Sequence, residues 1–312
     1  MPAQPEVAAI KAAQGHFMPV TMEEVGAIRR QAFSSPKNDA EDFRTDALFK
    51  DAAKLKGKVV LITGAGNLLG FGGQLALKAA SYGAKVVVSD LREEGVLSVV
   101  KEIEMRGGQA TGIACDVTDW DSQVRMFKHA VRVFGGVDVV VANAGMGDDP
   151  VPLLDETETD LGEPAKPLLK CLHVDLVGVI YSAKLAFYHL RRNPNTDVKS
   201  FLAVGSVSSF FAFPTQPLYA AAKHGVLGLC RALHYDGLEN GIKVSCIAPW
   251  IIETPILGAN AGALKDVPKG TVDDVVGAMV RAATTNESGK TFVVDEKGVF
   301  SLPHKASGYL GK

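Results

Sequence analysis

The chain has 312 residues, of which 47% are hydrophobic and 22% are charged, and its formal net charge at pH 7 is −2. This balance is typical of one soluble globular domain, and it provides no charge excess that would draw the chain to nucleic acid or to an anionic membrane. We expect no membrane span, because no uninterrupted apolar run approaches the ~20 residues of a spanning helix.

The first residues lack the basic-then-apolar pattern of a secretory signal, and acidic residues among them argue against an organelle transit peptide. The four cysteines, Cys115, Cys171, Cys230 and Cys246, form no C-x-x-C pair and have no histidine at metal-ligand spacing. We therefore expect reduced, mostly buried thiols, no metal site and a cytoplasmic location.

Residues 1–55 are predicted to form a helical arm rather than a domain. A capping-box signal from Thr21 to Glu24 opens a short amphipathic helix, and a second helical pattern runs over residues 41–55. We expect this arm to lie on the main domain or on a partner subunit. A gating role over the active site is the alternative.

From Lys58 onward the sequence alternates strand and helix patterns, and the strands are continuous apolar runs. Such strands are typical of a parallel sheet covered on both faces. We predict an α/β fold, a Rossmann-type doubly wound parallel sheet of about seven strands with helices on both faces. Residues 56–300 form one predicted domain and residues 301–312 a tail. Strands are predicted within residues 58–65, 85–90, 110–116, 137–145, 200–206, 243–249 and 290–296, and helices near residues 72–81, 93–105, 120–134, 167–190, 217–239 and 272–283.

A glycine-rich turn from Thr63 to Gly73 follows the first of these strands and opens a helix. Glycines permit a tight turn and let backbone N–H groups approach a pyrophosphate. The next strand ends on Asp90, whose carboxylate can accept hydrogen bonds from adenosine ribose hydroxyls and would repel a 2′-phosphate. The glycine loop holds no Lys or Arg, and Arg92 is the only cation near Asp90 in the sequence. We therefore expect NAD in preference to NADP.

The next two strand ends extend this predicted cofactor site. The third strand ends in the sequence CDVTD, where Asp116 and Val117 can flank an adenine. The fourth ends in Asn143, Ala144 and Gly145, a small-residue turn that can pass close under the cofactor.

The segment from Lys199 to Lys223 combines an apolar strand that ends on Ser206 with an Ala-rich helical pattern that opens with Tyr219. Tyr219 and Lys223 are four residues apart, so on a helix they emerge on one face, one turn apart. A phenol has a pKa near ~10, and a neighbouring ammonium favours phenolate and brings proton transfer within reach at neutral pH. Taken alone, a Tyr and a Lys at this spacing usually indicate only a half-solvated helix face.

These motifs, in this order, resemble the short-chain dehydrogenase/reductase family over about residues 55–300. They are the TG and GxG glycine loop, the aspartate that ends the second strand, CDVTD, NAG, and a serine 13 residues before a YxxxK motif. The segment TQPLYAAAKHGVLGLCRAL is further similar to the branch that contains 15-hydroxyprostaglandin dehydrogenase and its fungal relatives. In that branch a glutamine three residues before the tyrosine helps to hold the substrate oxygen, and Gln216 has this position.

The resemblance implies hydride transfer between a nicotinamide and a secondary alcohol or ketone. It implies Tyr219 as acid/base, Ser206 as donor to the substrate oxygen, and Lys223 as the residue that binds the nicotinamide ribose and tunes the tyrosine. It also implies a homodimer or homotetramer built on the helices near residues 167–190 and 217–239. The predicted catalytic residues are Ser206, Tyr219, Lys223 and Asp175, and the predicted substrate contacts are Ser206, Gln216 and Trp250. The predicted cofactor contacts are Gly64, Gly66, Asn67, Leu69, Gly70, Asp90, Asp116, Val117, Asn143, Ala144, Gly145, Tyr219, Lys223, Pro249, Ile252 and Thr254.

Three positions depart from the family pattern. The glycine loop is two residues longer than usual, so residues 70–72 are predicted to supply its final Gly-x-Gly while residues 65–69 bulge around the pyrophosphate. Pro249 precedes Trp250 rather than glycine, which is expected to place an indole against the substrate. Asp175 replaces an asparagine that usually maintains a water-linked proton path to the lysine, and it adds a charge near Lys223.

A lipophilic substrate is expected if Phe210, Phe211, Phe213 and Met146 line the ligand crevice rather than the core. The insert at residues 146–166 and the segment at residues 256–270 would then form its walls. A hydrolase is disfavoured because the sequence around Ser206 lacks a G-x-S-x-G elbow.

One alternative to an oxidoreductase stays open. It is a cofactor-binding protein whose redox role has been lost or redirected, either to a non-redox catalyst or to a regulatory scaffold. The intact set of Ser206, Tyr219 and Lys223 favours the oxidoreductase, whereas Asp175 and Trp250 keep the alternative open, and fold alone does not decide between them.

Overall fold

The computed structural model describes residues 41–43, 45–149, 153–193, 197–212, 216–256 and 267–304. The first predicted arm helix, Phe213 and most of the predicted wall at residues 256–270 lie outside the described residues.

The described strands form a single sheet in the order β1-β9-β8-β7-β6-β5-β2-β3-β4. Strands β2 to β8 run parallel and confirm the predicted doubly wound α/β fold. Strand order reverses between β2 and β5, and ligands of open α/β sheets bind outside the carboxyl ends of the strands at such a point. The parallel strands are β2 Val59–Ile62, β3 Lys85–Asp90, β4 Gln109–Ala114, β5 Val139–Ala142, β6 Ser200–Val204, β7 Lys243–Pro249 and β8 Lys290–Asp295.

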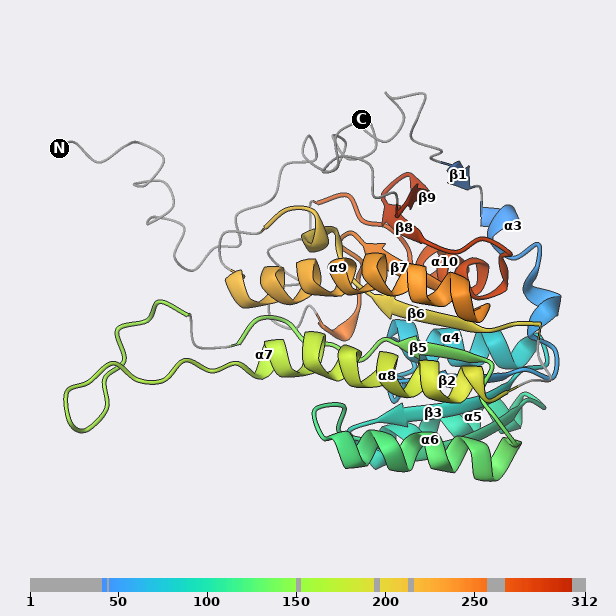
Figure 1. Ribbon diagram of the computed structural model, residues 1–312, viewed down its shortest axis with the longest axis horizontal. Coiled ribbons are helices and arrows are strands. Elements are labelled where there is room, and N and C mark those ends of the chain that lie inside the picture. The colour runs from blue at the N-terminus through green and yellow to red at the C-terminus, as the bar shows by residue number, and fades with distance from the viewer. Residues whose placement is uncertain are drawn as a thin grey trace.

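Helices cover both faces of the sheet (Figure 1). Helices α6, α8 and α9 pack on one face around a core cluster that includes Phe127, Leu190 and Phe201. Helices α4, α5 and α10 pack on the other face around a second core cluster, which includes Val60 and Ile62 of β2. The helix bounds are α4 Phe71–Ser81, α5 Glu93–Met105, α6 Trp120–Phe134, α8 Gly178–Arg191, α9 Pro217–Asn240 and α10 Val272–Thr284.

The helix predicted near residues 167–190 begins later and is irregular. It opens with α7 (Lys170–Leu172), continues as a π-helical turn, η2 (His173–Val177), and only then becomes α8. Single π-helical turns occur frequently at functional sites, and here the turn carries Asp175, which is fully buried.

The stretch Lys170–Arg191 is long and apolar enough to cross a membrane by length and composition alone, although Asp175 and Lys184 interrupt it. Half of its most apolar 18 residues are buried inside the protein, and α8 packs on β5 and β6.

Residues 41–55 do not form the predicted single helix. They form strand β1 (Glu41–Phe43), one turn of α3 (Thr45–Leu48) and the 3-10 helix η1 (Ala52–Leu55). Strand β1 pairs antiparallel with β9 (Gly298–Pro303), which pairs antiparallel with β8, so the sheet has two strands more than the predicted seven. Leu48, Ala52 and Leu55 are buried in the same core cluster as α10, so this segment is built into the sheet edge and the core.

The insert after β5 projects from the carboxyl edge of the sheet (Figure 1). Residues 153–164 are all exposed and form a small hairpin with a bridge between Glu158 and Pro164. Of the wall predicted over residues 146–166, residues 146–149 form hydrogen bonds with the elements that carry Asp175 and Tyr219.

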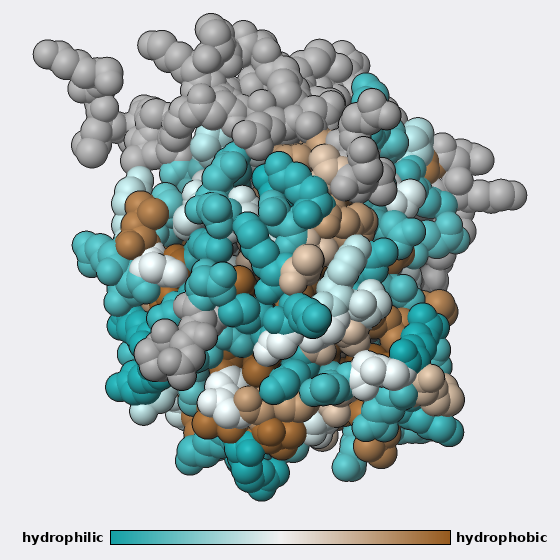
Figure 2. All heavy atoms as spheres, turned by 90° about the vertical axis from the view of Figure 1, so that its right-hand side faces the viewer, coloured by the Kyte–Doolittle hydropathy of each residue, from teal (hydrophilic) through white to brown (hydrophobic). Residues whose placement is uncertain are grey.

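The opposite face, which carries the amino ends of the strands, is mainly hydrophilic with scattered apolar residues (Figure 2).

Candidate functional site

Hydrogen bonds join the glycine loop to the small-residue turn after β5. The Thr63 hydroxyl accepts the backbone N–H groups of Asn143 and Ala144, both at 3.1 Å. The Asn143 amide in turn donates to the carbonyls of Thr63 and Gly64, at 2.9 and 3.0 Å. Gly64 has φ +64°, and a Cβ there would lie 2.6 Å from Cα of Ala144, so only glycine fits. Thr63 was not among the predicted site residues, although its place before the first glycine was a usable signal.

The two extra residues of the glycine loop are accommodated in a turn over residues 67–70. The Asn67 side chain accepts the N–H of Leu69 at 2.9 Å, and the Asn67 carbonyl accepts the N–H of Gly70 at 3.0 Å. Helix α4 then starts at Phe71 with Gly70 as its N-cap, and no side chain caps it. Uncapped N–H groups at a helix N-terminus suit an anion such as a pyrophosphate.

Asp90 lies against the same loop. One carboxylate oxygen accepts the N–H of Gly66 at 2.9 Å, and the other accepts the N–H of Arg92 at 3.2 Å. A Cβ on Gly66 would lie 2.7 Å from Cβ of Asp90, so a larger residue would displace the carboxylate. Each oxygen retains acceptor capacity for a ribose hydroxyl.

The end of β4 is adjacent to Asp90 through strand pairing. Asp116 is exposed, and one of its oxygens accepts both the N–H and the hydroxyl of Thr118, at 2.9 and 2.7 Å. Val117 is buried and packs on Gly178 at the start of α8. The structure thus places both predicted adenine contacts at the same edge as the glycine loop.

The chain after β7 forms the other side of this region. Ile252 is buried and bridges to Gly270. The Thr254 hydroxyl is buried and has no hydrogen-bond partner among the described residues. A cavity of about 480 Å³ brings Thr254 together with Leu69 and Gln74 of the glycine loop and α4. An unpartnered polar group beside a glycine loop with free N–H groups fits a dinucleotide cofactor.

Trp250 lies deeper than the sequence predicted. Its side chain is 5% exposed, and its indole N–H donates to the carbonyl of Pro268 at 3.0 Å. It packs in a cluster with Val207 and Phe300, against which Phe210 and Phe211 also pack. The indole therefore supports the wall beside Ser206, and its predicted contact with substrate stays a prediction.

The predicted catalytic lysine is buried between three elements. Lys223 Nζ lies 2.9 Å from a carboxylate oxygen of Asp175 and donates to the Val204 carbonyl at 3.1 Å. The same ammonium lies 5.4 Å from the ring centroid of Tyr219, on the same helix. The other Asp175 oxygen accepts the N–H of Met146 at 2.8 Å. The predicted proximity of Asp175 to Lys223 is thus confirmed.

Electrostatics keep this lysine charged. Burial alone would lower the pKa of Lys223, but the Asp175 carboxylate and the Tyr219 phenol outweigh it and raise that pKa. Burial also raises the pKa of the Asp175 carboxyl, against the opposing effects of Lys223 and the Met146 N–H. An ammonium has three N–H groups, and two are engaged by Asp175 and Val204, so one remains for a ligand.

Ser206 follows β6 and is held by a local capping box. Its hydroxyl oxygen accepts the N–H of Ser208 at 3.1 Å, and its own N–H donates to the Ser209 hydroxyl at 3.2 Å. The hydroxyl hydrogen stays available to donate. Gln216 is the half-buried N-cap residue of α9, which starts with Tyr219 in its first turn.

The cysteines do not compete as nucleophiles. All four are free and buried, which confirms the expectation from the sequence. Burial, followed by the Asp175 charge, raises the pKa of Cys171 to about 12. Within the described residues no group of three or more His, Cys, Asp or Glu side chains is placed to hold a metal ion.

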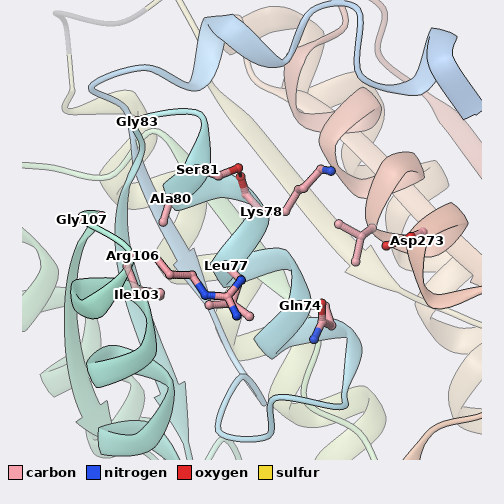
Figure 3. Close-up of a pocket in the computed structure, with 12 residues that line it drawn as sticks. Gln74, Leu77, Lys78, Ala80, Ser81, Gly83, Ile103, Arg106, Gly107 and Asp273 are labelled. Atoms are coloured by element: carbon pink, nitrogen blue, oxygen red, sulfur yellow. Dashed lines mark hydrogen bonds between the residues drawn. The ribbon is translucent and has the colours of Figure 1, made fainter.

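A second hollow, of about 560 Å³, opens on the outer side of α4 between α5 and α10 (Figure 3). Its two cations have local partners: Lys78 Nζ lies 4.4 Å from the ring centroid of Phe49, and Arg106 pairs with Glu102 at 2.6 Å. It contains none of the predicted catalytic residues, so we place the site at the carboxyl edge.

Comparisons with known proteins show which family the chain resembles. A family model described as short chain dehydrogenase matches residues 58–263. The chain is 30% identical over 275 residues to 5'-hydroxyaverantin dehydrogenase of Dothistroma septosporum, covering 81% of this chain and 89% of that protein. It is 35% identical over 229 residues to L-fucose dehydrogenase of Oryctolagus cuniculus, covering 73% and 74%. The crystal structure of 3-ketoacyl-(acyl-carrier-protein) reductase from Brucella melitensis complexed with NADH is similar at 27% identity with a TM-score of 0.67, covering 78% of this chain and 97% of that chain.

Proposed function

The chain belongs to the short-chain dehydrogenase family of oxidoreductases, and we propose that it transfers a hydride between NAD(H) and a secondary alcohol or ketone of a lipophilic small molecule. The observation that carries this proposal is the buried Lys223 ammonium, held by Asp175 and by the Val204 carbonyl beside the Tyr219 ring.

Each residue of the site has a separate role in the proposed reaction. Ser206 donates its hydroxyl hydrogen to the substrate oxygen. Tyr219 takes the alcohol proton during oxidation and returns it during reduction, and the Lys223 charge makes the phenolate accessible. The free N–H of Lys223 would hold the nicotinamide ribose, and the bound nicotinamide would supply or accept the hydride. Glycine-loop N–H groups, Asp90 and Thr254 would hold the remainder of the cofactor.

The preference for NAD over NADP rests on Asp90. Its carboxylate lies against the glycine loop, where a 2′-phosphate would meet a negative charge. The purified protein should bind NADH more tightly than NADPH, and Asp90→Ala should narrow the difference, because it removes both the ribose acceptor and the repulsion. Fluorescence titration with both cofactors measures this, and equal affinities in the parent protein would contradict it.

The lipophilic character of the substrate is supported by the wall beside Ser206. Phe210 and Phe211 are partly buried and pack against a cluster that contains Val207 and Trp250. Apolar linings with few polar groups are typical of small-molecule sites. A panel of secondary alcohols that differ in apolar size would measure this preference.

We further propose a homodimer or homotetramer built on α8 and α9. Both helices leave large apolar side chains exposed, with Ile180 at 42%, Tyr188 at 48%, Tyr235 at 51% and Leu238 at 60%. Exposed apolar groups that gather on one face are typical of protein interfaces. Light scattering at micromolar concentration should return an assembly of two or four chains, and a monomer would refute the proposal. The free, buried cysteines support a cytoplasmic location as a further part of this proposal.

A further inference from the structure

Tyr219 occupies the first turn of α9, where backbone N–H groups have no intrahelical partner. Helix α9 starts at Pro217, so Tyr219 is its third residue. Pro217 has no N–H, and the N-cap residue Gln216 makes no capping hydrogen bond through its side chain. The N–H groups of Leu218 and Tyr219 therefore need acceptors from elsewhere, or the turn that carries Tyr219 is prone to fray.

Asp148 supplies that acceptor from the loop after β5. One of its carboxylate oxygens accepts the N–H of Leu218 at 3.1 Å and the N–H of Tyr219 at 3.3 Å. A negative charge at this end of a helix also interacts favourably with the helix dipole. A residue about 70 positions earlier in the chain thus takes the place of a local N-cap.

The same loop is tied to the other half of the site. The N–H of Met146 donates to Asp175 at 2.8 Å, and Asp149 accepts the N–H of Cys171 in α7 at 3.2 Å. Helix α7 likewise lacks a side-chain cap of its own. The loop at residues 146–149 therefore contacts both elements that carry Tyr219 and Asp175, directly after the turn that is predicted to pass under the cofactor.

We propose that Asp148 is a positioning residue for Tyr219. By holding the first turn of α9 against the loop after β5, it fixes the distance between the phenol and the predicted nicotinamide position. The proposal rests on the proposed function, since it gives Tyr219 the proton-transfer role. A misplacement of about 1 Å at a reacting group can reduce a rate by up to 10²-fold.

The test compares Asp148→Ala with a matched variant, Asp138→Ala. The Asp138 carboxylate, just before β5, likewise accepts a backbone N–H from a distant segment, that of Val59 at 2.6 Å, at the amino ends of the strands and away from the site. Asp148→Ala should lower kcat by about tenfold with an unchanged dissociation constant for NADH. Asp138→Ala should lose thermal stability and keep the parent kcat. Asp148→Asn keeps an acceptor oxygen and should recover most of kcat.

Hydrogen exchange provides a readout that is independent of turnover. The peptide that contains Leu218 and Tyr219 should exchange its amides at least about tenfold faster in Asp148→Ala, and no faster in Asp138→Ala or Asp148→Asn. If this exchange is unchanged in Asp148→Ala, the proposal is overturned, and it is also overturned if both alanine variants lose kcat equally. If the parent protein turns over no alcohol or ketone, the proposed function fails separately while the exchange result still decides whether Asp148 holds this turn.

Discussion

The Tyr219→Phe protein should bind NADH as the parent protein does and turn over about 10² to 10⁴ times more slowly. Phenylalanine retains the ring, and thus the packing beside the Lys223 ammonium, whose Nζ lies 5.4 Å from the ring centroid. What is lost is the hydroxyl that takes or returns the proton. The loss should therefore appear in kcat rather than in cofactor affinity, and steady-state kinetics with a fluorescence titration separates the two.

Tyr82→Phe is the matched control, because Tyr82 ends α4 and stacks on Phe49 at a ring centroid distance of 6.3 Å, away from the carboxyl edge. That variant should keep the parent rate. If Tyr219→Phe also kept it, proton transfer would have to occur elsewhere, and the alternative of a redirected cofactor-binding protein would be favoured.

The Asp175→Asn protein should reach its oxidative rate at lower pH. Oxidation requires the phenolate form of the base, so the oxidative kcat/KM should rise with pH. The Asp175 carboxylate, 2.9 Å from Lys223 Nζ, partly cancels the positive potential that favours phenolate. Asparagine preserves the shape of the side chain and removes its charge. The rise of oxidative kcat/KM with pH should therefore shift to lower pH by about one unit. At a fixed pH within that rise, kcat/KM should be about tenfold higher in the variant.

The decisive comparison is the pH dependence of oxidative kcat/KM for the parent and the Asp175→Asn proteins. Cofactor affinity should stay nearly unchanged, because the bond of Lys223 to the Val204 carbonyl and its remaining N–H do not involve the Asp175 carboxylate. If the rise of kcat/KM with pH coincides in the two proteins, or lies at higher pH in the variant, the Asp175 carboxylate does not influence proton transfer by Tyr219. Asp197→Asn is the matched control, because the exposed Asp197 carboxylate pairs with Lys58 at the amino ends of the strands, and its pH dependence should coincide with that of the parent protein.

The parallel part of the fold could be predicted because its signals are local. Each buried strand is a continuous apolar run, as the fully buried β2 and β5 show. Helix α6 was predicted with its observed ends because Asp119 caps it and Gly135, with φ +86°, terminates it. Such signals lie within a few residues of the element that they define.

The features that the sequence did not predict depend on contacts between distant segments of the chain. Strand β1 has three residues and exists because β9, more than 250 residues later, offers it an edge. The capping of Tyr219 by Asp148 joins a loop to the start of α9, and no local pattern connects the two. The substrate contact of Trp250 stays a prediction, and the burial of its indole depends on Pro268 and on the cluster around Val207.

Some features of the site could likewise be predicted from the sequence, and others could not. Motif spacing predicted that Tyr219 and Lys223 share one helix face, and the family resemblance implied that Asp175 lies near Lys223. It did not indicate that a π-helical turn delivers Asp175 or that Thr63 fastens the loop after β5 to the glycine loop. These are contacts that the backbone creates only after the sheet has formed.

The central claim is that Tyr219 and Lys223 serve hydride transfer with a nicotinamide. Its most direct test is anaerobic incubation of the parent and Tyr219→Phe proteins with NAD and then with NADH, against a panel of lipophilic secondary alcohols and ketones, while the absorbance of the reduced nicotinamide is followed. The account predicts that at least one alcohol generates this absorbance, or one ketone consumes it, with the parent protein and about 10² to 10⁴ times more slowly with the variant. Cofactor binding by both proteins with no change in absorbance for any compound, or equal rates in the two, would contradict it.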